Sequence, residues 1–205
     1  MWKNILLCVS LLMGSFSAVA YDAVANSVFD AAGRGNLVLL NDFLQDLEVD
    51  VQDEEGMTPL HHAVEFMQLA AAQLLLVEYR ANPNLVNEQR RSPLHLAVSQ
   101  GCSAMEPVRF IPIIRALLRA DADIDATDIN GNTPLHLAAE MGTSIEIVEV
   151  LLENGASDDI FNRHNQRAKD VIPLVANVGN NLVIERLQAH ASRGAAPMDI
   201  DSEED

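Results

Sequence analysis

Blocks of apolar residues at helical spacing, separated by short polar stretches, fill most of this 205-residue chain. Leu, Ile, Val and Ala recur every three or four positions within each block, which predicts amphipathic helices. One sequence motif, Thr or Ser followed by Pro, Leu and His, which we call the phrase, occurs three times, at residues 58–63, 92–97 and 133–138. The copies begin 34 and then 41 residues apart. Self-similarity at such a period predicts a repeat architecture.

Each copy of the phrase opens a unit of two helices. Thr or Ser supplies an oxygen to the free amides at the helix start, and Pro follows where its missing N–H costs nothing. A glycine after the first helix, at Gly35, Gly101 and Gly142, predicts a left-handed helix end. A second apolar block, such as residues 147–152, forms the second helix. Two helices of this size cannot bury their apolar faces alone, so the units are expected to stack.

Two weaker copies flank the three clear ones and bring the count to five units. Residues 26–44 repeat the pattern upstream, and residues 167–187 repeat it downstream without the full phrase. Terminal units lose the consensus because one face of each meets water. The predicted repeat domain covers residues 21–192, with units near 25–55, 56–89, 90–130, 131–164 and 165–190.

The repeated phrase resembles that of the ankyrin repeat, in which Thr-Pro-Leu-His recurs about every 33 residues. The resemblance implies an all-α solenoid of about five stacked helix-turn-helix units with short hairpin connections. It also implies that the histidines of the phrase are structural, each bonded to backbone and to the Thr or Ser of its own phrase. The signature residues are Thr58, Pro59, His61, Ser92, Pro93, His95, Thr133, Pro134 and His136.

The third unit departs most from the repeat, with seven extra residues between its two helices. We expect the insert at residues 102–111 to form a loop and Pro112 to open the following helix. In the second unit, Met67 stands where its siblings have glycine, and Phe66 precedes it. Other residues that replace a repeat glycine, at modest cost, are Arg80, Arg90 and Asp121.

The first twenty residues have the parts of a secretory signal peptide of bacterial type. Lys3 gives a short basic start, residues 5–13 are apolar, and residues 18–20 form an Ala-x-Ala exit. We expect cleavage after Ala20, a periplasmic or secreted location, and no membrane insertion afterwards, because a spanning helix needs about 20 largely apolar residues. Cys102 is then the one thiol of the mature chain, so no intramolecular disulfide is possible.

The chain is strongly acidic, with 30 Asp and Glu against 13 Lys and Arg and a formal net charge of −17. This balance, without any basic stripe, argues against nucleic-acid binding, which depends on Lys and Arg displacing counterions from phosphates. The same charge favours a basic protein as the partner. We expect the chain itself to be a monomer. Residues 193–205 have the composition of an acidic disordered tail.

The sequence supports no catalytic, cofactor or metal site. The repeated histidines occur without the Cys or Glu partners of a metal motif. Residues 121–132 imitate the start of a calcium loop, but Ala126 stands where Gly is needed and Asn132 where a bidentate Glu is needed. Cys102 has no evident base beside it, which favours a buried or incidental thiol over a nucleophile.

These observations predict a non-catalytic protein-binding module outside the cytosol. Its expected role is to sequester or inhibit a basic protein, as an immunity protein inhibits a toxin. Two alternatives stay open: a secreted effector that binds a host protein, and a thiol-dependent enzyme or redox-protection factor that uses Cys102.

Partner contacts are expected where the chain departs from its own repeat. An apolar patch at the turns of the second and third units, framed by acidic hairpin residues, has the composition of an interface core with a charged rim. The opposing interpretation is that Phe66 folds inward and the insert packs on its neighbours. The predicted partner-binding residues are Phe66, Met67, Met105, Phe110, Asp53, Glu54, Glu55, Asp128 and Asn130.

Overall fold

The computed structural model describes residues 28–103, 107–141, 145–172 and 178–194. The predicted signal peptide, Met105, Gly142 and the acidic tail beyond Gly194 lie outside the described residues. No described helix has both the length and the apolar character that a membrane span requires.

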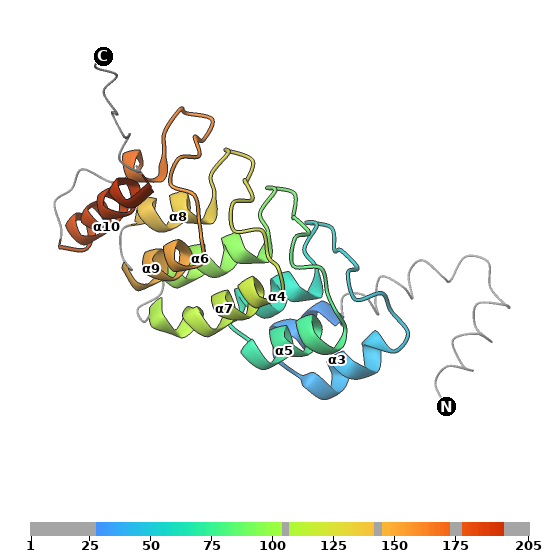
Figure 1. Ribbon diagram of the computed structural model, residues 1–205. Coiled ribbons are helices and arrows are strands. Elements are labelled where there is room, and N and C mark those ends of the chain that lie inside the picture. Colours follow the sequence, from blue (N-terminus) through green and yellow to red (C-terminus); the bar gives the residue numbers. More distant parts are fainter. Residues whose placement is uncertain (1–27, 104–106, 142–144, 173–177, 195–205) are drawn as a thin grey trace, which may run out of the picture.

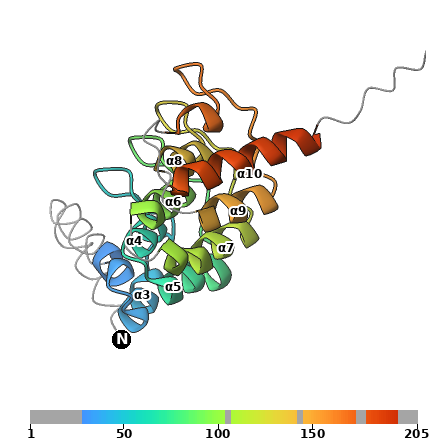
Figure 2. The same cartoon turned by 90° about the vertical axis from the view of Figure 1, so that its left-hand side faces the viewer.

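Helix pairs stack side by side in two rows, and loops project from one side of the stack (Figure 1). Figure 2 shows the same two rows in a view turned by 90°. The row nearer the loops holds the first helices of the units: residues 28–33, α4 (Pro59–Glu65), α6 (Pro93–Ser103), α8 (Pro134–Met141) and the short 3₁₀ helix η3 (Ala168–Asp170). The all-helical solenoid expected from the sequence is confirmed, and no strand occurs within the described ranges.

The other row holds the second helices. These are α3 (Leu37–Leu44), α5 (Leu69–Gln73) continued by the π-helical η1 (Leu74–Glu78), α7 (Ile111–Arg119), α9 (Ile145–Glu153) and α10 (Val178–Gly194). The last of them, α10, packs against α9, and its Val183 and Leu187 are buried. It closes the end of the stack and carries the ion pair of Arg186 with Glu149, at 3.6 Å.

Small and large apolar side chains alternate in the core between neighbouring units. Each phrase contributes one fully buried leucine and one fully buried alanine: Leu60 and Ala63, Leu94 and Ala97, Leu135 and Ala138. Burying each leucine stabilises the fold by about 1.5–3 kcal/mol. The small alanine side chains let α4, α6 and α8 pack closely against one another.

The left-handed helix ends fall where the sequence placed them in the first two units. Gly35 has φ 67°, and Met67 adopts φ 55° in the same place of the next unit. The equivalent prediction for Gly101 is wrong, because α6 continues through it to Ser103. The insert folds back onto this helix, and a Cβ on Gly101 would lie 3.0 Å from the Cβ of Phe110. The glycine is therefore needed for close packing rather than for a turn.

The other glycine replacements are accommodated by strained backbone. Arg80 and Asp121 have φ 54° and 61° at the end of the second helix, where Gly155 has φ 90°. Arg90 has φ 58° in the hairpin, where Gly56 and Gly131 have φ 75° and 76°. Positive φ is uncommon for residues with a Cβ, so each of these positions costs some stability without changing the path of the chain.

The second helix of unit two contains a π-helical segment that the sequence analysis did not predict. Both units two and four end on a buried alanine (Ala81 and Ala156) 23 residues after the cap, so the segment arises without an inserted residue. In η1 the N–H of Tyr79 donates to the carbonyl of Leu74 at 3.3 Å, five residues back, which is the bond of a π-helical turn.

The insert of unit three is more ordered than the predicted loop. Its first residues extend α6, and residues 107–110 form the 3₁₀ helix η2 (Pro107–Phe110). Pro112 is the second residue of α7, close to the predicted helix start. The expected loop is thus wrong for the described part of the insert, because these residues form helical turns that pack on α6, α7 and α9.

Candidate functional site

Four hairpins between the units are organised by one repeated residue type. An Asp or Asn side chain accepts hydrogen bonds through Oδ1 from the N–H groups two and four residues further on, at 2.8–3.0 Å. These acceptors are Asp53, Asn87, Asp128 and Asn162. Each stands five residues before the position of the Thr or Ser cap, a periodic signal that the sequence analysis missed.

Asp128 is therefore corrected from a partner-binding residue to a hairpin residue, and Asp53 has the same structural role in its own hairpin. Asp128 is 2% exposed, and its second oxygen lies 3.8 Å from Nε of Arg91. Asp53 is partly buried, and its Oδ2 lies 2.7 Å from Nε2 of His62. Carboxylates engaged in this way shape the loop, because their oxygens already face protein donors.

Backbone hydrogen bonds tie each hairpin to the next. The N–H of Glu88 donates to the carbonyl of Glu55 at 3.0 Å, and the N–H of Arg163 donates to the carbonyl of Asn130 at 2.9 Å. The side chains of Glu54, Glu55 and Asn130 remain exposed. Of the predicted hairpin contacts, these three can meet a partner.

The histidines of the phrase link neighbouring units, as the resemblance implied. In His61, His95 and His136, Nδ1 lies 2.8–2.9 Å from the hydroxyl of the cap, and Nε2 lies 3.0–3.1 Å from a carbonyl of the following unit. A carbonyl only accepts, so Nε2 is the donor of that bond, and Nδ1 accepts from the backbone N–H of the cap residue. Burial lowers the pKa of His61 to about 4 and also lowers that of His95.

The predicted apolar patch is not assembled. Phe66 is 58% exposed, but Phe110 is only 7% exposed and packs over Gly101, which corrects its assignment as a contact residue. Met67 is partly buried against the core. Met105 lies outside the described residues. Phe66 is thus the one member of the patch that the described structure presents to solvent.

Two hollows open on the surface formed by the first helices and the hairpins, which we call the first-helix face. The aromatic hollow, about 490 Å³, lies between units one and two. Its lining residues are Phe29, Asp30, Gly33, Arg34, Asp53, His62, Glu65 and Phe66. Apolar rings and carboxylates meet there within one depression.

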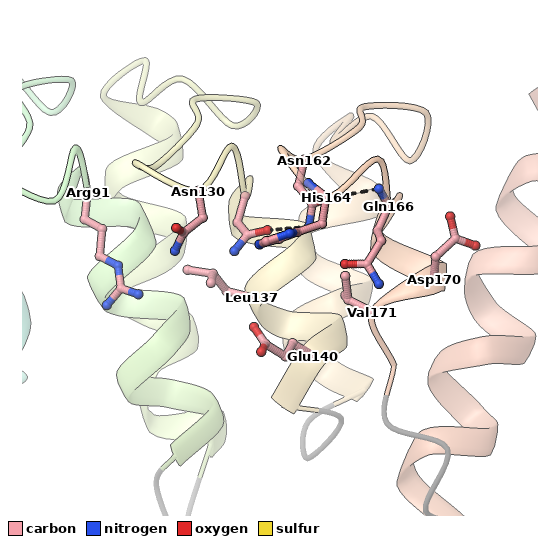
Figure 3. A pocket seen from close by; sticks show the side chains of 10 residues that line it. Arg91, Asn130, Leu137, Glu140, Asn162, His164, Gln166, Asp170 and Val171 are labelled. Carbon is pink, nitrogen blue, oxygen red and sulfur yellow. Dashed lines mark hydrogen bonds between the residues drawn. The ribbon is translucent and has the colours of Figure 1, made fainter.

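The amide hollow, about 470 Å³, lies between units four and five (Figure 3). In Figure 3, Leu137 and Glu140 project from α8, and the hairpin residues lie above them. The lining residues are Arg91, Asn130, Asn132, Leu137, Glu140, Asn162, His164, Gln166, Asp170 and Val171. Part of the lining is fixed by hydrogen bonds, since Nδ2 of Asn162 donates to Oδ1 of Asn132 at 2.9 Å.

Cys102 and the acidic and histidine side chains are the candidate reactive groups of the described residues. The thiol of Cys102 is buried, which raises its pKa to about 12 and keeps it protonated at neutral pH. Within the described ranges, no three His, Cys, Asp or Glu side chains are placed to hold a metal ion together. The hollows instead offer carboxylates, amides and aromatic rings to a surface that docks on them.

Comparisons with known proteins agree with this architecture. A family model described as "Ankyrin repeats (3 copies)" matches residues 28–128 and 108–164. Human ankyrin repeat domain-containing protein 53 is 36% identical over 113 residues, which cover 55% of this chain and 21% of the human protein. An ankyrin repeat protein of Rickettsia bellii is 30% identical over 166 residues, covering 78% of this chain and 46% of that protein. NF-kappa-B inhibitor alpha of Sus scrofa is 38% identical over 123 residues, covering 60% and 35%. The chain spans less than half the length of each of these relatives.

Proposed function

The chain belongs to the ankyrin-repeat family, and from that premise we propose that it is a non-catalytic interaction module whose first-helix face binds a basic protein. The observation that carries the proposal is the first-helix face itself. Two hollows there bring polar and aromatic side chains together, whereas the exposed apolar side chains of the second helices, such as Val38 and Val77, line neither hollow. A net charge of −17 speeds encounter with a basic partner and disfavours acidic ones.

Inhibition by sequestration fits this arrangement. A rigid face that covers a basic surface blocks what that surface otherwise binds, with no chemistry required. One relative, NF-kappa-B inhibitor alpha, is named for inhibiting another protein. The proposal for this chain is of the same kind, with the basic partner held on the first-helix face.

We further propose that the protein acts outside the cytosol, in the periplasm or after secretion. Support comes from residues 1–20, which combine a basic start, an apolar centre and an Ala-x-Ala exit. N-terminal sequencing of the protein from fractionated cells tests this. A start at Tyr21 in the extracytoplasmic fraction is expected, and intact Met1 in the cytosol would contradict it.

A thiol assay separates this function from the thiol-enzyme alternative. The folded protein is expected to leave Cys102 unmodified by an aromatic disulfide reagent at pH 8, because the thiol is buried and protonated. The same reagent should modify it fully after denaturation. Rapid modification of the folded protein would favour the thiol-dependent reading.

Site-specific photo-crosslinking tests the face that binds. A photo-reactive side chain is placed at three exposed positions of the first-helix face, Phe66, Asn130 and His164, and at three exposed positions of the second helices, Val77, Arg115 and Glu153. Crosslinks to a basic protein are expected only from the first set. Crosslinks from the second set alone would show that the proposed face is wrong.

A further inference from the structure

The aromatic hollow combines three rings in a way that no other described hollow does. The rings of Phe29 and His62 lie with centroids 5.2 Å apart, tilted by 37°. The ring of Phe66 covers Gly33, where a Cβ would lie 3.0 Å from Cδ2 of the phenylalanine. The absence of a side chain at residue 33 therefore lets the Phe66 ring settle against the first helix. Phe66 is nevertheless 58% exposed, so a ring face is accessible to a ligand.

Carboxylates surround these rings with different degrees of engagement. Asp53 is committed to its hairpin and to His62. Asp30 lies 2.7 Å from Nε of Arg34, an ion pair in which both side chains are largely exposed. Glu65, which is partly buried, makes no hydrogen bond or ion pair with any described residue. Among the described side chains, the hollow thus has one carboxylate without a partner, Glu65, and a second one, Asp30, held by a weak surface pair.

Resting on the proposed function, we propose that the aromatic hollow is the anchor site for an arginine side chain of the basic partner. A guanidinium stacks on an aromatic face and at the same time donates two parallel hydrogen bonds to a carboxylate. Phe66 supplies the exposed face, and Glu65, one residue before it, supplies the free carboxylate. Arg34 already lines the hollow and pairs with Asp30, so a guanidinium fits these surroundings.

The amide hollow provides an internal control for this assignment. Glu140 stands seven residues after Thr133, as Glu65 stands seven residues after Thr58, so the two glutamates are equivalent in the repeat. Beside Glu140 the hollow is lined by Leu137 and by amides, with no aromatic ring among its lining residues apart from the imidazole of His164. A carboxylate without an exposed phenylalanine ring beside it should hold a guanidinium less well.

The experiment uses a capped nine-residue Gly-Ser peptide that carries three arginines, and the same peptide with citrulline in place of arginine. Binding to the purified protein is measured by calorimetry at low ionic strength, and backbone NMR shifts locate the site. Phe66→Ala and Glu65→Gln are each expected to weaken binding of the arginine peptide about tenfold. Glu140→Gln and Phe161→Ala, which removes a phenylalanine of similar exposure (54%), should change it less than about twofold.

A further variant is expected to strengthen binding of the arginine peptide instead of weakening it. Arg34→Gln releases Asp30 and removes a competing cation, so it should strengthen arginine-peptide binding about two- to threefold. Phe66→Leu keeps an apolar side chain without the ring and should bind as weakly as Phe66→Ala. Equal binding of the citrulline peptide, equal effects of Glu65→Gln and Glu140→Gln, or NMR shifts spread over the acidic surface would overturn the proposal. Equal binding of a lysine peptide would overturn the assignment to arginine.

Failure of this anchor site and failure of the proposed function give different results. If crosslinks from Asn130 and His164 capture the partner while Phe66→Ala and Glu65→Gln leave capture unchanged, the anchor site is wrong and the proposed function stands. If no position on the first-helix face yields a crosslink, the proposed function is wrong, and the peptide titration still reports on the hollow by itself.

Discussion

The two hollows of the first-helix face each lie between a terminal unit and its neighbour, yet the contacts that close these two unit boundaries differ. At units four and five, Nε2 of His136 donates to the carbonyl of Gln166 at 3.0 Å. At units one and two, the position equivalent to the histidine is Phe29, whose buried ring packs near His62. At this position the first boundary is closed by packed rings, and the last is closed by a hydrogen bond.

The difference shows how a repeat scaffold acquires a specific surface. Unit one lacks the full phrase, and Phe29 stands at the position of its histidine. An apolar ring there replaces the side chain that would donate to the next unit. The neighbouring unit adjusts at Phe66 and Gly33, which pack together across the boundary. The proposed anchor site thus lies at a boundary where a terminal unit has lost the histidine of the repeat.

Replacing the buried ring of the first boundary should have the largest effect. Phe29→Ala removes a side chain that is 6% exposed and is expected to destabilise unit one by about 3–5 kcal/mol. A terminal unit has one neighbour, so residues 28–47 should lose amide protection first. Urea unfolding combined with hydrogen exchange measures both effects. The control, Phe161→Ala, should stay within about 0.5 kcal/mol of the original protein, and a similar loss in both variants would contradict the role of Phe29.

The hydrogen-bonded boundary is tested by His136→Ala. The variant leaves a buried hydroxyl and the carbonyl of Gln166 without their partner, which should cost about 1–3 kcal/mol. Binding of the arginine peptide should hardly change, because the aromatic hollow lies at the other end of the stack. Urea unfolding and calorimetry provide the measurements. Full stability together with lost binding would show that this histidine serves recognition instead of stacking.

Acid should weaken the histidine-bonded boundaries. The pKa of His61 is lowered to about 4 when folded, against about 6.5 in an unfolded chain. As the pH falls below 6.5 the unfolded chain takes up a proton that the folded ring refuses, so the free energy of unfolding drops by up to about 1.4 kcal/mol per pH unit until the pH approaches 4. His95 acts in the same direction.

The matching variant is His61→Phe, which gives unit two the residue type of Phe29. Its free energy of unfolding, measured in urea between pH 7 and pH 5, should depend less steeply on pH than that of the original protein. Identical slopes would mean that His61 does not contribute to the acid response.

The exposed hairpin carboxylates should have the smallest effect, and it should be kinetic. Glu54→Gln and Glu55→Gln, made together, remove charge from the hairpin tip outside either hollow. They are expected to lower the association rate of the arginine peptide about twofold and to reduce its salt dependence, with the dissociation rate nearly unchanged. Stopped-flow binding at two ionic strengths measures this. A change confined to dissociation would place these glutamates inside the contact.

Sequence signals were sufficient wherever the structure depends on residues a few positions apart. Thr58 accepts from the N–H of His61 at 3.3 Å, and its own N–H donates to the imidazole at 3.1 Å, a local arrangement that the phrase predicts. The left-handed residues Arg80 and Arg90 were located by comparing units, because equivalent positions share a backbone path. The Asp and Asn residues of the hairpins carried an equally regular signal, five residues before each cap position, and it was overlooked.

Sequence patterns did not predict features that depend on contacts with residues far away in the chain. The π-helical turn of η1 was not predicted, because residues 74–78 have the same apolar pattern as an ordinary second helix. Gly101 looked like a helix end but serves as a packing surface, because the insert and Ile147 of the next unit reach it.

The sequence by itself determined the repeat and the pairing of helices, since both follow from short-range chemistry that recurs along the chain, and its resemblance to the ankyrin repeat implied the histidine links. Only the tertiary structure decided the fate of two phenylalanines that the sequence placed in one patch. Phe110 is buried because α6 and α9 close over it, whereas Phe66 meets a single helix at Gly33 and keeps one side in solvent. The reason is physical: burial depends on how many neighbours surround a side chain, and those neighbours come from other units of the stack.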